Sequence, residues 1–459
     1  LKNRQYLIIT LLEAPALAVL LSFYTRSSRS LSGLITDYTF GMNENLPAYL
    51  FMTVIVALFL GLVLSAEEIF RDRKILERER FLNLSRFSYL VSKISILFII
   101  SAIQMLLFVV IGNSILEICS MTWRYFLILF SASCWANLVG LNISAGFKSV
   151  VTIYILVPLI LVPQLLFSGV VVDFHNLNKA IYNTKSVPLV GELMTSRWAY
   201  EALMVTQYKD NPFQKELFNT ELVMSESMYK KAYVIPKLRS VIGELESGEN
   251  SGMENTGQYD PARLLVNETE RMGKDLDINT IGIPEAFRAG EFSGSDMKKL
   301  QGFLDISWKK YHSRYLRAAD DKEAVLASLK EKFNGTQGLA AMENKYANNR
   351  LSEIVRNENE LVEYVIDENE IIRMRDPVHT LPLLNNGRAH FYAPYKKVSG
   401  VYLDTFWFNM LVIWLSAGLW FVILYYDLLR KLIQYIENIQ LQRFNRKIIK
   451  KLKQNENRQ

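Results

Sequence analysis

Six long apolar stretches constrain the fold of this chain more than any other feature. Five carry no charged residue: Ala48–Ala66, Ile94–Leu116, Tyr125–Phe147, Ser149–Val172 and Thr405–Tyr426. The sixth, Tyr6–Tyr24, carries one charge, at Glu13. A helix needs about 20 mostly apolar residues to cross the hydrocarbon core of a bilayer, and the mean hydropathy of the chain is +0.10. The sequence therefore predicts an all-α protein: a six-span helical membrane bundle with a mostly helical domain inserted between spans five and six.

The distribution of Lys and Arg predicts the orientation of these spans. The loop at residues 67–93 holds seven of them and the tail after Tyr426 holds nine, whereas residues 25–47 and 117–123 hold two and none. Cytoplasmic loops of membrane proteins are enriched in Lys and Arg. We therefore expect a multi-pass plasma membrane protein, with both termini cytoplasmic and residues 173–404 outside.

The net charge of +6 follows the same division of the chain. Residues 173–404 hold 30 Lys and Arg and 34 Asp and Glu, which leaves 22 of the chain's 52 basic and 12 of its 46 acidic residues elsewhere. The excess of positive charge is thus a sign of membrane topology, and we expect no nucleic-acid partner.

The predicted spans divide the chain into four parts. Residues 1–172 hold a connecting helix and spans 1–5, residues 173–404 an extracytoplasmic domain, residues 405–426 span 6, and residues 427–459 a basic cytoplasmic tail helix. The tail is amphipathic, which suits either adsorption to anionic lipid headgroups or a regulatory role.

Helical periodicity in the predicted outer domain is clearest in three places. We expect a helix over Phe213–Ile235, two or three helices over Pro284–Phe333, and an amphipathic helix over Leu351–Ile372. Residues 376–400 contain three prolines and two glycines, and we expect them to return to the membrane without regular structure.

Three local features leave alternatives open. The segment 67–88 packs five acids and six bases at helical spacing, which suits either a charged helix facing a cytoplasmic partner or a solvated helix without one. Pro158 and Pro163 should bend or break the fifth span, which either lines a cavity or packs as a kinked helix. Glu13 either reaches the cytoplasmic membrane surface or serves a substrate or proton.

Motifs of catalysis are missing from the sequence. It has no phosphate-binding loop, dinucleotide-binding glycine motif, zinc-protease motif or CxxC pair, and its four histidines lie at no ligand spacing. We expect no catalytic residue and no metal site in this chain. Transport, scaffolding and sensing remain, with an ion channel the weakest candidate because the spans carry no charged ring motif.

Five segments in order resemble the transmembrane domain of ABCG-type (White family) ABC transporters. They are LKNRQYLIITLLEAP (1–15), SAEEIFRDRKILERERFLNLSRFSYLVSK (65–93), GLNISA (140–145), PQLLFSGVVV (163–172) and SRWAYEAL (196–203). The resemblance covers residues 1–213 and 401–430, whereas residues 214–400 have no counterpart in the familiar members. The chain is thus similar to a bacterial inner-membrane member of this family with an enlarged extracytoplasmic domain.

The resemblance implies the permease part of an ATP-driven ABC exporter. Such a permease moves a lipid-like or amphipathic substrate by alternating access. It is coupled to an ATPase (nucleotide-binding) domain that we expect N-terminal to Leu1 or on a separate subunit. ATP and Mg²⁺ would bind to that domain, and no cofactor to this chain. The implied partners are a second transmembrane half forming a homodimer, the nucleotide-binding domains, membrane lipid, and an extracytoplasmic partner of residues 214–400.

The same resemblance assigns roles to individual positions. The substrate cavity would be lined by Leu58, Gly61, Pro158, Val162 and Leu165, and a hydrophobic plug would consist of Val170 and Val171. Coupling to the ATPase would fall to Glu68, Arg71, Arg78, Glu79, Arg80 and Arg86. The alternative is a non-transporting membrane scaffold or sensor whose helical outer domain binds a partner.

Overall fold

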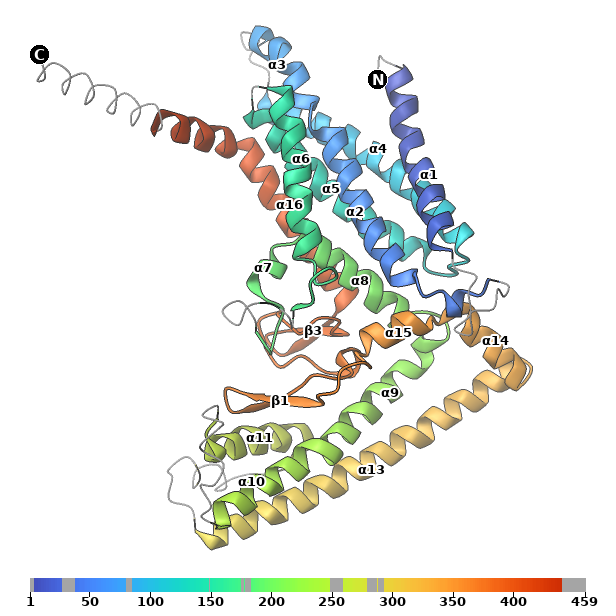
Figure 1. Ribbon diagram of the computed structural model, residues 1–459, viewed down its shortest axis with the longest axis vertical. Coiled ribbons are helices and arrows are strands. Elements are labelled where there is room, and N and C mark those ends of the chain that lie inside the picture. The colour runs from blue at the N-terminus through green and yellow to red at the C-terminus, as the bar shows by residue number, and fades with distance from the viewer. Residues whose placement is uncertain are drawn as a thin grey trace, which may run out of the picture.

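The computed structural model describes residues 4–26, 38–79, 85–147, 149–174, 177, 183–247, 259–278, 287 and 293–439, apart from the side chains of residues 4, 6, 7 and 74–79. A bundle of long helices forms one end of the molecule, and a second, mostly helical part extends from the other end of that bundle (Figure 1). We call the second part, residues 210–404, the inserted domain.

Five helices of the described residues are long and apolar enough to cross a membrane, which confirms the predicted all-α membrane bundle. They are α1 (Arg4–Thr25), α2 (Leu46–Ser65), α4 (Arg86–Ile115), α5 (Thr122–Gly146) and α16 (Thr405–Tyr425). Together with the shorter α6 (Val150–Leu166), which lies between α5 and α16 in the sequence, these helices alternate in direction along the chain. As a result, the described N-terminal end and the helical residues 428–439 lie at the same end of the bundle (Figure 1).

The sixth apolar helix, α6 (Val150–Leu166), is shorter than the stretch Ser149–Val172 predicted for it. It has 17 residues and continues through Pro158 and Pro163, so of the predicted bend or break at the prolines, the break is not found. A proline inside an apolar helix is tolerated where neighbouring helices satisfy the freed backbone groups. The helix ends instead before Gly169, whose φ of +81° is easily reached only by glycine.

The centre of the bundle is α5, which packs closely against α2 through small residues. A Cβ atom added at Gly61 would lie 2.6 Å from the carbonyl oxygen of Ser133, and one added at Gly140 would lie 3.0 Å from that of Leu62. Small residues at a helix interface let the two backbones approach, which favours association inside a membrane. The α2–α5 pair is therefore the tightly packed core of the bundle.

The short helix α3 (Glu68–Glu79) lies at the bundle end that also carries the described N-terminal residues (Figure 1). It confirms the helix predicted within the charged segment 67–88.

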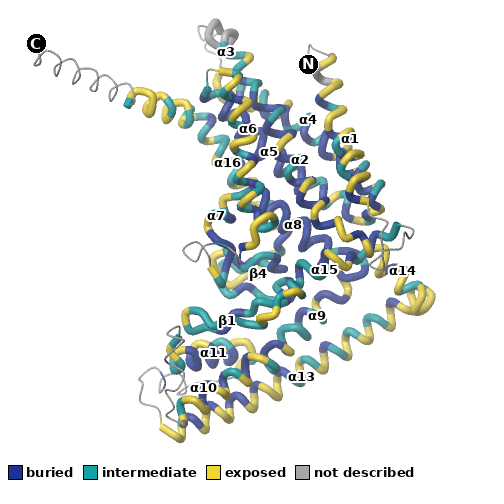
Figure 2. Tube along the Cα trace, in the orientation of Figure 1, coloured by how far each residue is buried: buried dark blue, intermediate teal, exposed yellow. Residues whose placement is uncertain are grey.

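The helix α8 (Thr195–Lys209) closes the opposite end of the bundle. The short helix α7 (Leu189–Glu192) precedes it. Every residue of α8 is buried, although its sequence mixes charged and apolar side chains (Figure 2). The helix is covered on all sides because it lies between the bundle and the inserted domain.

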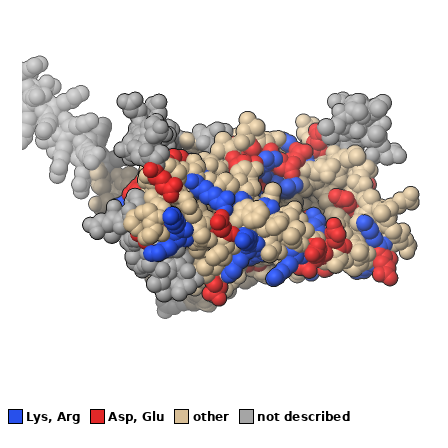
Figure 3. All heavy atoms as spheres, turned by 90° about the horizontal axis from the view of Figure 1, so that it is seen from below, with Lys and Arg blue, Asp and Glu red and all other residues tan. Residues whose placement is uncertain are grey.

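The inserted domain is built on helices around its own apolar core. The helices are α9 (Gln214–Tyr229), the π-helical turn η4 (Lys230–Val234), α10 (Ile235–Ser247), α11 (Pro261–Leu276), α13 (Gly294–Lys332), α14 (Thr336–Tyr346) and α15 (Asn349–Val355). The core joins buried side chains of η4, α10, α11 and α13 and is separate from the core of the bundle. On the face of this domain farthest from the bundle, acidic and basic side chains lie interspersed (Figure 3).

Three helical predictions for this domain can be compared with the structure. The helix over Phe213–Ile235 is confirmed by α9 and η4. Over Pro284–Phe333, Phe287 is helical and α13 is a separate helix of 39 residues that begins at Gly294, which agrees with a break at this glycine; residues 288–292 lie outside the described part. A capping box at Ser293 starts α13. The helix contains no proline, and its one interior glycine, Gly302, does not break it.

The helix predicted over Leu351–Ile372 is wrong. α15 ends at Val355, and a hairpin of β1 (Tyr364–Asp367) and β2 (Glu370–Arg373) follows. Glu368 and Asn369 both have positive φ, as a two-residue hairpin turn requires, and the flanking strands are rich in Val and Ile.

The segment 376–400 is more regular than predicted. It contains the 3₁₀ turn η5 (Pro377–His379) and β3 (Tyr395–Val398), which pairs with β4 (Val401–Asp404) across Ser399 and Gly400. Both turn residues have positive φ. A second 3₁₀ turn, η1 (Phe40–Met42), precedes α2.

Candidate functional site

The helix α3 is attached to the bundle by an ion-pair clamp. Lys93 Nζ, in the second turn of α4, lies 3.0 Å from Glu68 Oε2 and 2.7 Å from Asp72 Oδ2. Tyr89 donates a hydrogen bond of 3.1 Å to the same Asp72 carboxylate. One lysine thus holds two successive turns of α3, and we call these three charged residues the Lys93 clamp.

A second attachment joins α3 to the end of α5. The Ser144 hydroxyl accepts hydrogen bonds from the backbone N–H groups of Ile69 (3.0 Å) and Phe70 (2.9 Å). These groups are in the first turn of α3, where N–H donors have no partner within the helix. At the other side, Arg73 donates to the carbonyl oxygens of Ala145 and Phe147, at the C-terminal end of α5. These contacts attach α3 directly to the C-terminal end of α5.

The coupling residues implied by the resemblance fall partly on this arrangement. Glu68 is in the clamp and also pairs with Arg71. Arg86 lies 2.5 Å from Asp427, beyond the end of α16. The side chains of Arg78 and Glu79 and the whole of Arg80 lie outside the described residues.

The residues assigned to a substrate cavity do not share one surface in the single chain. Leu58 and Gly61 are buried against α5, whereas Pro158 and Val162 lie on the exposed face of α6 and Leu165 is half-buried. The structure does not test their role in binding, which remains a prediction.

The C-terminal end of α6 is attached to the start of α8 by two hydrogen bonds. Gln164 accepts a hydrogen bond of 2.9 Å from the backbone N–H of Ser196, and the Ser196 hydroxyl donates to the Gln164 carbonyl oxygen at 2.6 Å. The chain then turns at Gly169. Val170, one of the two residues assigned to the plug, is half-buried and Val171 is exposed. The end of α6 and the start of α8 therefore behave as one joined unit.

Comparison with known proteins explains this arrangement of helices. Residues 2–208 match the family model of the ABC-2 type transporter membrane domain. These residues form an ABC-2 type transporter membrane domain. No curated protein and no solved structure is a significant match to the chain. An ABC-2 membrane domain belongs to an ABC transporter and works with an ATPase partner, and the multi-pass membrane location follows from the same match.

The match ends at Tyr208, one residue before the end of α8. The ABC-2 domain thus comprises α1 to α8, and α16 completes the bundle after the inserted domain. Three polar contacts bind α16 to α5: Trp135 to Ser416, Asn142 to the carbonyl oxygen of Trp420, and Trp414 to Ser131.

A buried ionic cluster joins the ABC-2 domain to the inserted domain, and sequence analysis missed it. Glu201 of α8 lies 2.8 Å from Lys396 of β3 and 3.6 Å from Arg197, and all three side chains are fully buried. Asn409 of α16 donates to Glu201 at 2.8 Å. Burial raises the pKa of the Glu201 carboxyl, but the charges of Arg197 and Lys396 outweigh it and hold the pKa below its usual value. We call these four residues the Glu201 cluster.

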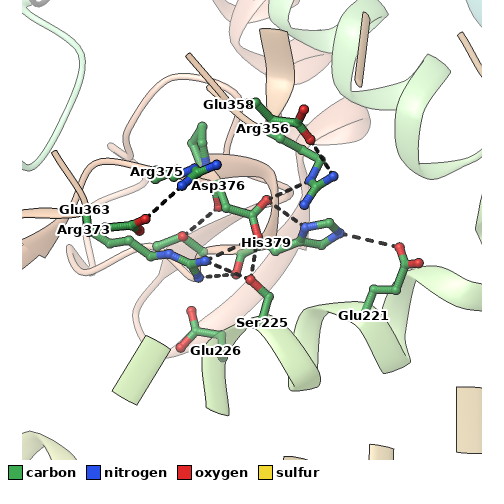
Figure 4. A network of polar contacts seen from close by, with 12 residues as sticks. Glu221, Ser225, Glu226, Arg356, Glu358, Glu363, Arg373, Arg375, Asp376 and His379 are labelled. Carbon is green, nitrogen blue, oxygen red and sulfur yellow. Dashed lines mark hydrogen bonds and ion pairs between the residues drawn. The ribbon is translucent and has the colours of Figure 1, made fainter. Parts of the chain in front are cut away.

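A second polar network lies inside the inserted domain, around Asp376 (Figure 4). The Asp376 carboxylate lies 2.8 Å from His379 Nδ1 and 3.2 Å from Arg373 Nη2, and it accepts a hydrogen bond from Ser225. Burial alone would raise the pKa of Asp376, but the His379 contact and the Arg373 charge hold it well below its usual range. The network fixes the β1–β2 hairpin and η5 onto α9.

Neither network resembles a metal site. Among the described residues, no group of three His, Cys, Asp or Glu side chains could hold a metal ion. The described residues support a mechanical role. At one end of the ABC-2 domain a charged helix, α3, is attached to the central helix α5, and at the other end the Glu201 cluster forms a rigid polar junction.

Proposed function

We propose that this chain is the permease half of an ATP-driven exporter. Two copies would form a homodimer in a plasma membrane and move a lipid-like or amphipathic molecule outward by alternating access. The proposal rests on the ABC-2 family match together with the resemblance to ABCG-type transporters. ATP and Mg²⁺ would act on the ATPase partner, whose conformational change reaches this chain through α3.

The attachment of α3 to α5 carries this proposal. The helix presents charged residues at one end of the bundle, and the Lys93 clamp and Ser144 connect it to α4 and α5. Because interiors are closely packed, a rigid connection turns a displacement of α3 into a displacement of α5 rather than a local deformation. This firm attachment favours the alternative in which the charged helix faces a cytoplasmic partner over a solvated helix without one.

The orientation follows from charge. The helix α3, within the Lys- and Arg-rich segment 67–93, lies at the same end of the bundle as residues 428–439, and the inserted domain lies at the opposite end (Figure 1). The enrichment of Lys and Arg on the cytoplasmic side of membranes supports an extracytoplasmic position for the inserted domain. There it could receive substrate or bind an extracytoplasmic partner.

An exposed carboxylate on α1 supports the homodimer. Glu13 is exposed near the middle of α1, between the exposed apolar residues Leu12 and Val19. A carboxylate at mid-depth costs about 2.5–3.5 kcal/mol to place in lipid. A second copy or a water-filled passage at this face removes that cost.

The apolar character of the exposed α6 face supports the substrate class. Ile155, Leu159 and Val162 are all more than 45% exposed and line one side of this helix. An apolar surface with few polar groups favours a lipid-like or amphipathic molecule over a sugar.

The experiment that tests the proposal compares Lys93→Met with Arg26→Met. Each variant removes one basic partner of an ion pair, Lys93 at the α3 end and Arg26, 2.8 Å from Glu117, at the opposite end. The chain is purified with its ATPase in lipid nanodiscs, and ATP hydrolysis and export of a fluorescent phospholipid analogue are measured. We expect Lys93→Met to lower the rates of ATP hydrolysis and of export by about fivefold or more, as is usual for lost coupling. Arg26→Met should leave the two rates unchanged.

Two results would contradict the proposal. Equal ATP hydrolysis and export in the two variants would show that the Lys93 clamp transmits nothing. A complex that binds the ATPase normally but exports no amphipathic probe in any form, wild type included, would favour the scaffold instead.

A further inference from the structure

A further helical segment follows the last span, at the end of the bundle that carries α3. The span α16 has 21 residues and is therefore about 31 Å long, close to the thickness of about 30 Å of the hydrocarbon core of a bilayer. It ends at Tyr425, and the adjoining Tyr426 is exposed, as tyrosines at a membrane surface commonly are. The helical residues 428–439, which we call the C-terminal helix, therefore begin at the depth of the lipid headgroups.

A bend separates the C-terminal helix from α16 and turns it away from the axis of the bundle (Figure 1). Asp427, between the two helices, has a φ of +51°, which is outside the range of an α-helix. Arg86 of α4 holds this bend from the side. Its guanidinium lies 2.5 Å from the Asp427 carboxylate and donates a hydrogen bond of 3.0 Å to the carbonyl oxygen of Leu424. The direction of the C-terminal helix is therefore fixed by contacts with the bundle.

The C-terminal helix has an apolar side and a polar side. Four apolar side chains spaced at helical intervals are each 45% exposed or more: Leu428, Leu432, Tyr435 and Ile436. At 3.6 residues per turn these side chains form one stripe along the helix, and the polar positions 430, 434 and 437 fall on the opposite side. A contiguous exposed apolar surface of this kind marks a place of contact with lipid or protein.

Two further apolar side chains attach the C-terminal helix to α5. Leu429 and Ile433 are half-buried, and a Cβ atom added at Gly146 would lie 3.4 Å from Leu429 Cδ2 and 3.2 Å from Ile433 Cδ1. The carbonyl oxygens of the residues on either side of Gly146 accept hydrogen bonds from Arg73 of α3. The C-terminal helix and α3 therefore contact the same end of α5.

Position and charge favour a lipid surface as the cover of the exposed stripe. The exposed apolar side of α16 runs through Leu415 and Leu419 to Tyr426, two residues before the stripe begins. The stripe thus continues from a surface that already faces the hydrocarbon core. Residues 428–459 hold nine Lys and Arg and two Asp and Glu. A basic segment directly beside a membrane span is attracted to anionic headgroups.

We propose that the C-terminal helix lies on the membrane surface at this end of the bundle and binds anionic lipid. Its apolar stripe enters the boundary between headgroups and acyl chains, as in other amphipathic surface helices. Lys431 lies at the edge of the stripe, where a long side chain reaches the headgroup phosphates. This inference goes beyond the proposed transport function, because surface binding needs neither ATP nor a transported molecule.

The test measures hydrogen–deuterium exchange of peptides from residues 428–439 by mass spectrometry. The full chain with its ATPase is placed, without ATP, in nanodiscs of phosphatidylcholine or of an equal mixture with anionic phosphatidylglycerol. We expect exchange about tenfold slower in the mixture, the order expected when two basic side chains meet an anionic surface. The difference should disappear in about 1 M salt, which screens charges beyond about 3 Å. Peptides of α14, in the inserted domain, should exchange equally in the two lipids.

Two variants separate the apolar stripe from charge alone. Leu432→Glu and Gln434→Glu each make the helix more negative by one charge, the first within the stripe and the second on the polar side. Both residues are exposed, so the bundle should fold normally in either variant. We expect Leu432→Glu to lose the slowing by anionic lipid, which raises the exchange rate in the mixture about tenfold. Gln434→Glu should stay within about twofold of the wild type, because its side chain faces water.

Three results would overturn the inference. Equal exchange of the wild type in the two lipids would show that anionic lipid does not bind the C-terminal helix. Slow exchange in both lipids that Leu432→Glu abolishes in both would assign the stripe to a protein, either the ATPase or a second copy. Equal losses in Leu432→Glu and Gln434→Glu would show that the stripe contacts nothing. None of these results bears on the exporter proposal, which is tested by ATP hydrolysis and export.

Discussion

The two ends of the ABC-2 domain are held by ion pairs of opposite character. At the α3 end, the side chains of Lys93, Glu68 and Asp72 keep between 15% and 26% of their surface exposed. At the α8 end, the side chains of Arg197, Glu201 and Lys396 keep none. Water near the first set screens the charges and can replace a lost partner, whereas nothing replaces a partner lost from the second set.

The difference indicates where the molecule can move. The partly exposed ion pairs of the Lys93 clamp can rearrange at small cost while Ser144 and Arg73 keep α3 attached to α5, which suits an end that follows another protein. The Glu201 cluster joins α8, β3 and α16 and cannot open without leaving buried charges unpaired. We infer that the α8 end and the adjoining part of the inserted domain move as one piece and that adjustment is concentrated at α3.

The largest predicted effect is at the buried end. Lys396→Met leaves Glu201 buried beside Arg197 with one partner fewer, and we expect a loss of about 3–5 kcal/mol in the free energy of unfolding. Arg86→Met removes the exposed partner of Asp427 and should cost about 1 kcal/mol or less. Both are measured by unfolding of the full chain in the same detergent. Similar losses in the two variants would remove the distinction between the two ends.

The next effect concerns the helix that connects the ends. Gly61→Ala places a methyl group 2.6 Å from the Ser133 carbonyl oxygen, so α2 and α5 must separate, at a cost of about 1–3 kcal/mol. Gly418→Ala on α16, where an added Cβ meets nothing within 4 Å, is the matched control and should be neutral or slightly stabilising. The comparison also tests the cavity role assigned to Gly61: unchanged stability with altered substrate preference would support that role and argue against tight packing.

The smallest effect is a pH dependence in the inserted domain. The folded-state pKa of Asp376 is depressed, so its stabilising contribution is complete above the unfolded-state pKa of about 3.9 and is lost as pH falls through the lower folded-state value. Asp376→Asn lacks this contribution. The difference in unfolding free energy between wild type and Asp376→Asn should therefore be constant from pH 7 to 5 and shrink between pH 4 and 3. A difference that grows on acidification would reverse the assigned direction.

The membrane bundle was predictable because each span depends on the transfer of its own residues into lipid, which is a local property. The helix α3 was also predictable from a local property, the recurrence of its charges at helical spacing. The ends of α6 were less predictable, since its apolar run continues past the turn at Gly169 to Val172. Composition cannot show where an apolar helix stops.

The Glu201 cluster could not be predicted, although Arg197 and Glu201 were visible as a pair four residues apart. Their partner Lys396 is 195 residues away and lies on a strand that the sequence analysis expected to be irregular. The β1–β2 hairpin was missed for a different reason. Acids between apolar residues imitate an amphipathic helix over Leu351–Ile372, while the useful signal was the β-branched run on both sides of Glu368 and Asn369.

The length of α13 has a mechanical consequence. With 39 residues, this helix is about 58 Å long. Phe213, just before α9, and Leu217 of α9 pack near its C-terminal end with Met342 of α14, and the separate core of the inserted domain surrounds its N-terminal half. A tilt of about 10° imposed at the C-terminal end would carry the far end through about 10 Å for a rod of that length. A small rotation of α13 at its C-terminal end therefore produces a large displacement of its N-terminal end. A displacement of that size is enough to make or break contact with another molecule.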